Sequence, residues 1–161
     1  AGFSKTLSGQ TLNENLKILE PMLGKTRLSG QAWQGEMKSP DGTKSFNVFT
    51  TYESMWNGSV VKFTRTIPDF NSSSEGYFYW DGDSKSIKLF EINSRAAAGT
   101  YNVIVEDGKV TVKGVLAIDN RKFDFKNTFE FTSDGKMIDR WFQNAFGPWQ
   151  AGHVIEFTKL Q

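Results

Sequence analysis

The chain has no cysteine and only one histidine, His153. The lack of cysteine excludes disulfides, thiol catalysis and thiolate metal sites. A single histidine cannot supply the several nitrogen ligands of a typical zinc site. The sequence also lacks the Gly-x-Ser-x-Gly, Gly-x-Gly-x-x-Gly and P-loop motifs. It therefore shows no recognisable catalytic motif and predicts no metal.

Charge of one sign and long apolar runs are equally scarce. The 19 basic and 18 acidic side chains give a net charge of +1. So small an imbalance gives no electrostatic reason to expect nucleic acid as a partner. No apolar run reaches the ~18 residues that a membrane span requires. The compartment stays open between cytoplasm and periplasm or exterior, because a chain without cysteine suits each.

Aromatic residues are plentiful and indicate a substantial core. They make up 14% of the 161 residues, with 14 Phe, 5 Trp and 4 Tyr, against 23% charged residues. Large aromatic side chains contribute much of the buried area in a small fold. We therefore expect one globular domain over residues 1–161, as a monomer or a homodimer.

The first regular segment reads as an amphipathic helix over residues 11–23. Its leucines recur at spacings of three and four, which is the helical period. Thr11 and Glu14 form a candidate capping box at its start. Pro21 predicts an end or a kink near Glu20, and Gly24 is a suitable stop.

After Gly24 the apolar period changes to two, which predicts about ten strands. Turn residues such as Asp107-Gly108 and Asp134-Gly135 separate them, and residues 71–74 read as a polar loop. The predicted strands are residues 27–37, 46–56, 60–67, 76–80, 86–92, 100–105, 110–118, 123–131, 137–144 and 152–160. Short turns favour an antiparallel meander, which closes to remove its edges. The fold class is therefore all-β: an antiparallel up-and-down barrel of the lipocalin-like kind with a short N-terminal helix.

Several polar residues share the phase of the apolar residues on their strands. Burial of such groups without partners is costly. They either serve as polar handles in a ligand pocket, or pair with one another or reach water at the barrel rim. These residues are Arg65, Glu91, Asn127, Arg140 and His153. Arg65 is the first candidate for a handle, because an inward arginine suits a carboxylate.

Four aspartates are predicted to lie in turns or to point outward: Asp119, Asp124, Asp134 and Asp139. No carboxylate pair for acid–base work follows from their spacing. An enzyme built from Asp, Arg, Tyr and the one His remains an alternative without a motif behind it.

Two stretches carry a family resemblance. The segment from Leu16 to Leu23 and Gly24, followed by Ala32-Trp33-Gln34-Gly35, resembles the opening of calycin-like barrel proteins. The run from Phe131 to Arg140 and then Gly147-Pro148-Trp149 resembles the closing hairpin of uncharacterised bacterial lipocalin-like proteins. Gln31 departs from the Gly-x-Trp of lipocalins in the narrow sense. The resemblance implies a barrel that carries a ligand.

A more distant likeness is to nitrobindins, ten-stranded barrels that bind haem through a histidine near the C-terminus. Trp33 and Gly35 match their early Gly-x-Trp-x-Gly-x-Gly, whereas Gln31 and Met37 replace the flanking glycines. This resemblance implies haem as an alternative cofactor with His153 as its ligand. Otherwise no cofactor is expected.

The favoured function is binding or carriage of a small, mostly apolar molecule, such as an apolar acid, inside the barrel. The predicted ligand-binding residues are Arg65, Arg140, Trp33, Phe49, Phe63, Tyr79, Phe125 and Phe129. The alternatives are a small-barrel enzyme such as an isomerase or cyclase, the haem barrel, and a packed barrel that acts as an interaction module.

Overall fold

The computed structural model describes residues 12–23 and 30–160. A 3₁₀ helix, η1 (Glu14–Leu19), runs directly into the short helix α1 (Glu20–Leu23). Ten strands follow: β1 (Gln31–Lys38), β2 (Ser45–Met55), β3 (Val60–Ile67), β4 (Ser72–Asp81), β5 (Ser86–Asn93), β6 (Ala98–Glu106), β7 (Lys109–Ile118), β8 (Arg121–Phe131), β9 (Met137–Gln143) and β10 (Gln150–Lys159). Short 3₁₀ turns η2 (Trp56–Gly58) and η3 (Pro68–Phe70) lie between strands.

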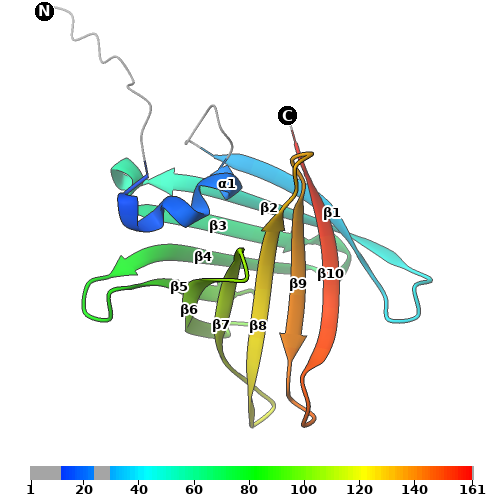
Figure 1. The fold of residues 1–161 in the computed structure, drawn as a ribbon. Helices are drawn as coiled ribbons and strands as arrows, with labels where there is room; N and C mark the ends of the chain where they lie inside the picture. Colours follow the sequence, from blue (N-terminus) through cyan, green and yellow to red (C-terminus); the bar gives the residue numbers. More distant parts are fainter. Residues whose placement is uncertain (1–11, 24–29, 161) are drawn as a thin grey trace, which may run out of the picture.

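Each strand pairs antiparallel with the next, and β1 pairs with β10, so the sheet closes into a barrel (Figure 1). This confirms the predicted all-β, up-and-down barrel of ten strands with a short N-terminal helix. Closure leaves no sheet edge exposed, which is the physical reason why a meander of this length forms a barrel.

The hairpin turns follow from their sequence. Asp107 and Gly108 connect β6 to β7, and both have positive φ, 51° and 73°. Asp119 and Asn120 connect β7 to β8 in the same way, at 50° and 62°. Two successive positive φ angles match the right-handed twist of paired strands, and Asp, Asn and Gly tolerate them best.

Strand β4 begins earlier than predicted. The sequence favoured a polar loop at residues 71–74, but Ser72, Ser73 and Ser74 pair with β3, and Ser74 also pairs with Asn93 of β5. The prediction was wrong because the main-chain hydrogen bonds that pair neighbouring strands form whether the side chains are polar or apolar. The predicted beginning of the first strand, at Arg27, lies outside the described residues.

The helical segment covers one end of the barrel (Figure 1). Leu16, Leu19, Met22 and Leu23 are fully buried in the core. The Trp33 indole nitrogen of β1 donates a hydrogen bond of 3.0 Å to the main-chain oxygen of Met22. The change from 3₁₀ to α geometry occurs at Glu20, where Pro21 predicted an irregularity. The predicted cap Thr11 and stop Gly24 lie outside the described residues.

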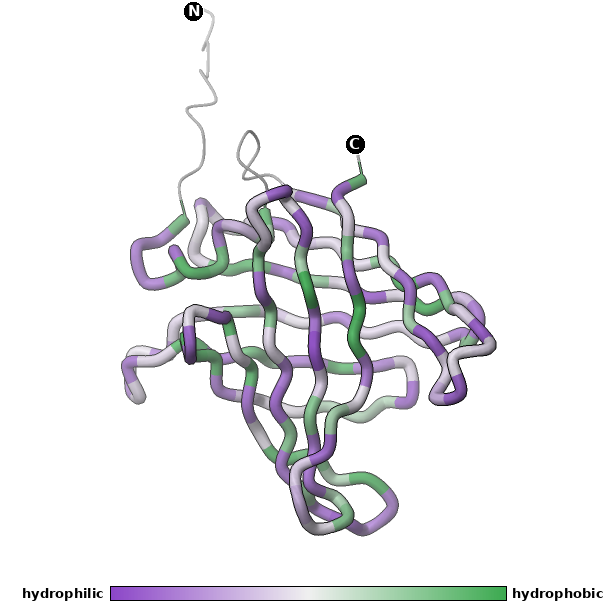
Figure 2. The backbone as a smooth tube through the Cα atoms, turned by 45° about the vertical axis from the view of Figure 1, so that its right-hand side comes forward, coloured by the Kyte–Doolittle hydropathy of each residue, from purple (hydrophilic) through white to green (hydrophobic). Residues whose placement is uncertain are grey.

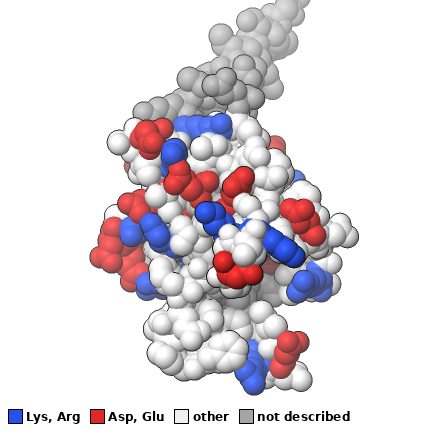
Figure 3. Space-filling view, turned by 90° about the vertical axis from the view of Figure 1, so that its right-hand side faces the viewer, with Lys and Arg blue, Asp and Glu red and all other residues white. Residues whose placement is uncertain are grey.

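Hydrophilic and hydrophobic residues alternate along the strands (Figure 2), as the period of two predicted. Basic and acidic side chains are interspersed on the face shown in Figure 3, consistent with the balanced charge. None of the helices in the described part of the chain has the length and apolar character needed to cross a membrane.

Candidate functional site

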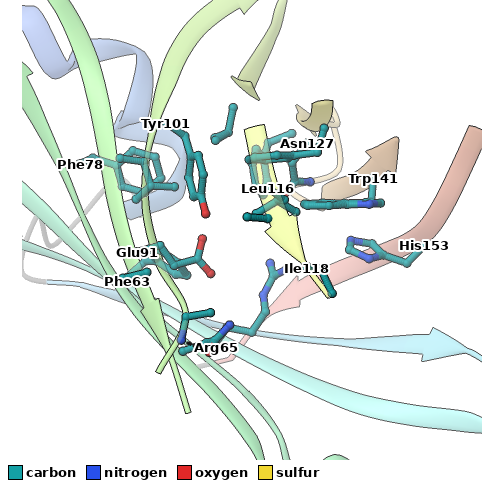
Figure 4. Close-up of a pocket in the computed structure, with 18 of the residues that line it drawn as sticks. Phe63, Arg65, Phe78, Glu91, Tyr101, Leu116, Ile118, Asn127, Trp141 and His153 are labelled. Atoms are coloured by element: carbon teal, nitrogen blue, oxygen red, sulfur yellow. Dashed lines mark hydrogen bonds between the residues drawn. The ribbon is translucent and has the colours of Figure 1, made fainter. Parts of the chain in front are cut away.

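A cavity of about 310 Å³ lies inside the barrel. Its lining includes Leu116 and Ile118 at the end of β7 and Ala98 at the beginning of β6. These positions lie toward the barrel end opposite the helix. Its wall includes seven aromatic side chains: Tyr52, Phe63, Phe78, Tyr101, Phe125, Phe129 and Trp141. Figure 4 labels Phe63, Phe78, Tyr101 and Trp141 among them. Buried side chains of the helical segment, including Leu16 and Leu19, lie at the other end of the core.

A buried carboxylate, Asp139, organises the polar side of this cavity. It has no exposed surface, and its two oxygens accept hydrogen bonds from three other strands. Arg65 Nη2 of β3 lies 2.6 Å from Oδ2, while Asn127 Nδ2 of β8 and His153 Nε2 of β10 lie 2.5 and 3.1 Å from Oδ1. Arg65 Nε also donates to Thr50 Oγ1 of β2 at 3.1 Å. We call Arg65, Asn127, Asp139 and His153 the Asp139 cluster.

The prediction that Asp139 points outward was wrong. Strand β9 carries apolar residues on both faces, and the sequence assigned Ile138 and Phe142 to the interior. In the structure Asp139 lies opposite the buried Phe129 of β8. The residues of β9 that alternate with Ile138 therefore face inward, namely Met137, Asp139 and Trp141. The outward or turn prediction holds for Asp119, Asp124 and Asp134, which are exposed.

His153 reaches the cluster at an irregularity in β10. The pairing between β9 and β10 shifts register between Ala151 and Val154. Such a bulge changes the direction in which a side chain points. The His153 ring then lies beside Trp141, with ring centroids 6.0 Å apart. The predicted phase of His153, shared with the buried Ile155 and Phe157, agrees with this placement.

The charges in the cluster are mutually stabilised. Burial by itself would raise the pKa of Asp139, but the Arg65 guanidinium and the His153 hydrogen bond outweigh burial. The pKa of Asp139 is therefore lowered from 3.8 to about 2. Asp139 is ionised at neutral pH, so Arg65 and Asp139 form a paired cation and anion in the interior.

A second carboxyl, Glu91 of β5, lines the same cavity. Burial raises its pKa, and the charge of Arg65 offsets this only in part. Burial also raises the pKa of the neighbouring Tyr101 hydroxyl, to which the charge of Glu91 adds. Figure 4 shows Glu91 and Tyr101 on one side of the cavity and Trp141 and His153 on the other. Within one cavity, the pKa of Asp139 is thus lowered and the pKa of Glu91 is raised.

The structure brings half of the predicted ligand-binding residues to the cavity. Arg65, Phe63, Phe125 and Phe129 line it. Of the further inward polar candidates, Glu91, Asn127 and His153 also line it. The pairing interpretation is confirmed for Arg65, Asn127 and His153, which all bond to Asp139 at the cavity wall.

The other four predicted residues lie elsewhere. Trp33 is buried, but it packs below the helix. Phe49 alternates with the buried Val48 and Thr50, and Tyr79 follows the buried Phe78, so both lie on the outer face. Arg140 points outward because Asp139 points inward. The inward facing predicted for Phe49, Tyr79 and Arg140 was wrong because apolar groups occur on both faces of their strands, whereas Trp33 faces inward but lies outside the cavity.

Sequence reasoning missed Phe78, Tyr101 and Trp141 as cavity residues. Alternation could have found Tyr101, which is in step with the buried Val103, and Trp141, which is in step with Met137. No signal local to β9 could have shown that Asp139 meets Arg65, a residue 74 positions away.

The arrangement gives little support to haem or metal. His153 would have to release Asp139 before Nε2 could ligate an iron, and that contact helps to hold the buried carboxylate. Within residues 12–23 and 30–160, no three metal-ligating side chains gather at one point.

Comparison with known proteins adds no family to this description. No protein-family model matches the chain, and no curated protein matches it either. The function therefore has to be argued from the cavity and the Asp139 cluster.

Proposed function

We propose that this protein binds a small, mostly apolar molecule inside its barrel. The observation that carries the proposal is the cavity of about 310 Å³, with aromatic walls and a fixed polar cluster on one side. Small-molecule sites have this composition: apolar surface supplies affinity, and a few oriented polar groups supply specificity. A volume near 300 Å³ lies at the small end of the range of such sites.

Rigid placement of the polar groups supports the same conclusion. Arg65 is held at Nε by Thr50 and at Nη2 by Asp139. Its remaining guanidinium nitrogen, Nη1, forms no hydrogen bond with the described residues and can donate to a ligand. A side chain held in this way loses little conformational entropy on binding. Because Asp139 already balances its charge, Arg65 serves better as a hydrogen-bond donor than as the counter-ion of an acid.

The test is a fluorescence titration with N-phenylnaphthylamine, an uncharged apolar dye that brightens when it leaves water. We expect saturable one-to-one binding to the wild-type protein. Leu116→Trp should abolish it, because Leu116 lines the cavity and the larger ring fills that space. Val115→Trp is the matched control, because Val115 is 55% exposed on the outer face of the same strand.

Circular dichroism checks that both variants keep the barrel. Dye binding that survives in Leu116→Trp would refute the cavity as the site. A complete lack of saturable binding by the wild-type protein, with this dye and with a panel of apolar alcohols, amines, acids and haem, would refute the proposal as a whole.

A further inference from the structure

Two side chains of the Asp139 cluster have nitrogen or oxygen atoms at the cavity that make no hydrogen bond with the described residues. Asn127 donates both amide hydrogens, to Asp139 and to the main-chain oxygen of Arg140, which leaves its side-chain oxygen free to accept. Because Asp139 is ionised, His153 must carry a hydrogen on Nε2 to bond to it. The other ring nitrogen, Nδ1, forms no hydrogen bond with the described residues.

Glu91 adds a carboxyl group that has no basic partner. Glu91 lines the cavity but takes part in none of the ion pairs among the described residues. Arg65 is bonded to Asp139 instead, so their charges cancel within the pair. An ionised Glu91 therefore leaves the cavity with an excess of negative charge. A half-buried carboxylate of this kind is stabilised by a cation that enters the same low-dielectric space.

The walls are suited to the same kind of ligand. Trp141 stacks on Phe125 with ring centroids 4.7 Å apart, and Tyr101 meets Phe125 edge-on at 4.8 Å. These rings pack against one another and form an apolar wall, which provides the contact that the body of the ligand requires.

We propose that the preferred ligand is a protonated amine with a compact apolar body, whose ammonium group binds the Glu91 carboxylate. This inference rests on the proposed function and names the ligand class for the same cavity. An acid is disfavoured, because its carboxylate would face Glu91 while Arg65 is already neutralised by Asp139. An alcohol can use the free acceptors but gains no charge pairing.

The experiment compares three ligands that share one carbon frame: phenethylamine, phenethyl alcohol and phenylacetate. Each competes with N-phenylnaphthylamine at neutral pH. We expect the amine to bind at least about tenfold more tightly than the alcohol, since charge-assisted hydrogen bonds exceed neutral ones by about that factor. Phenylacetate should bind most weakly.

The discriminating variant is Glu91→Gln, which keeps the shape of the side chain and removes its charge. It should bring the amine to within about twofold of the alcohol and leave the affinity for the alcohol unchanged. Glu75→Gln on the neighbouring strand β4 is the control, because Glu75 pairs with Lys62, both partly exposed on the outer face. It should alter none of the three affinities.

The outcomes separate this inference from the proposed function. If the alcohol or the acid binds as tightly as the amine, or if Glu91→Gln keeps the preference for the amine, the ligand class is wrong while binding in the barrel stands. If neither the dye nor any of the three ligands binds, the ligand class is wrong, and failure of the wider panel as well would refute binding in the barrel.

Discussion

Asp139→Asn is expected to destabilise the barrel by about 3 kcal/mol. The substitution keeps the shape of the side chain and removes the charge that balances Arg65. Asp139 is 0% exposed and Arg65 17% exposed, so the guanidinium would remain in the interior without a counter-ion. Removing one partner of a buried ion pair costs about 3–5 kcal/mol, and the access of Arg65 to the cavity places the value at the lower end. This is a large part of the ~5–15 kcal/mol that stabilises a typical domain.

The assay is equilibrium unfolding in urea, followed by tryptophan fluorescence and circular dichroism. Asp83→Asn is the control, because Asp83 is exposed in the β4–β5 turn and should change the free energy of unfolding by less than about 0.5 kcal/mol. Arg65→Met combined with Asp139→Asn should cost less than the sum of the two single changes, because no charge is then left unpaired. A cost below about 1 kcal/mol for Asp139→Asn, or simple additivity in the double variant, would refute the reasoning.

Three further predictions concern pH, packing and an unsatisfied hydroxyl. The folded-state pKa of Asp139, about 2, lies below its ordinary 3.8, so its ionisation stabilises the fold above about pH 4 and this contribution disappears as the pH falls toward 2. Acid titration should show a loss of about 2 kcal/mol that the Asp139→Asn protein lacks. Gly76→Ala should cost about 1–3 kcal/mol in urea unfolding, because the new Cβ would lie 2.7 Å from the main-chain oxygen of Phe90, whereas Gly82→Ala, with open space around it, should be neutral. Ser54→Ala should leave the thermal midpoint unchanged or raise it, and a clear fall would contradict the buried Ser54 hydroxyl having no partner among the described residues.

The barrel itself could be predicted because its signals are local. Apolar residues alternate along each strand, and pairs such as Asp107-Gly108 mark the turns. Where one face is strongly apolar, as with Phe125 and Phe129 on β8, alternation also identifies the inner face correctly. Arg65 was identified as an inward polar group for the same reason. These features depend on the spacing of apolar residues along each strand, which can be read directly from the sequence.

The sequence by itself determined the strands, the hairpins, the helix and most of the polar residues that point inward. The tertiary structure decided which face of β9 is the inner one, because both of its faces carry apolar residues and alternation gives only a relative phase. It also decided that Arg65, Asn127 and His153 meet on Asp139, since barrel closure brings strands together that are distant along the chain. The cavity likewise depends on how side chains from many strands fill the interior, and no local pattern encodes the space that they leave.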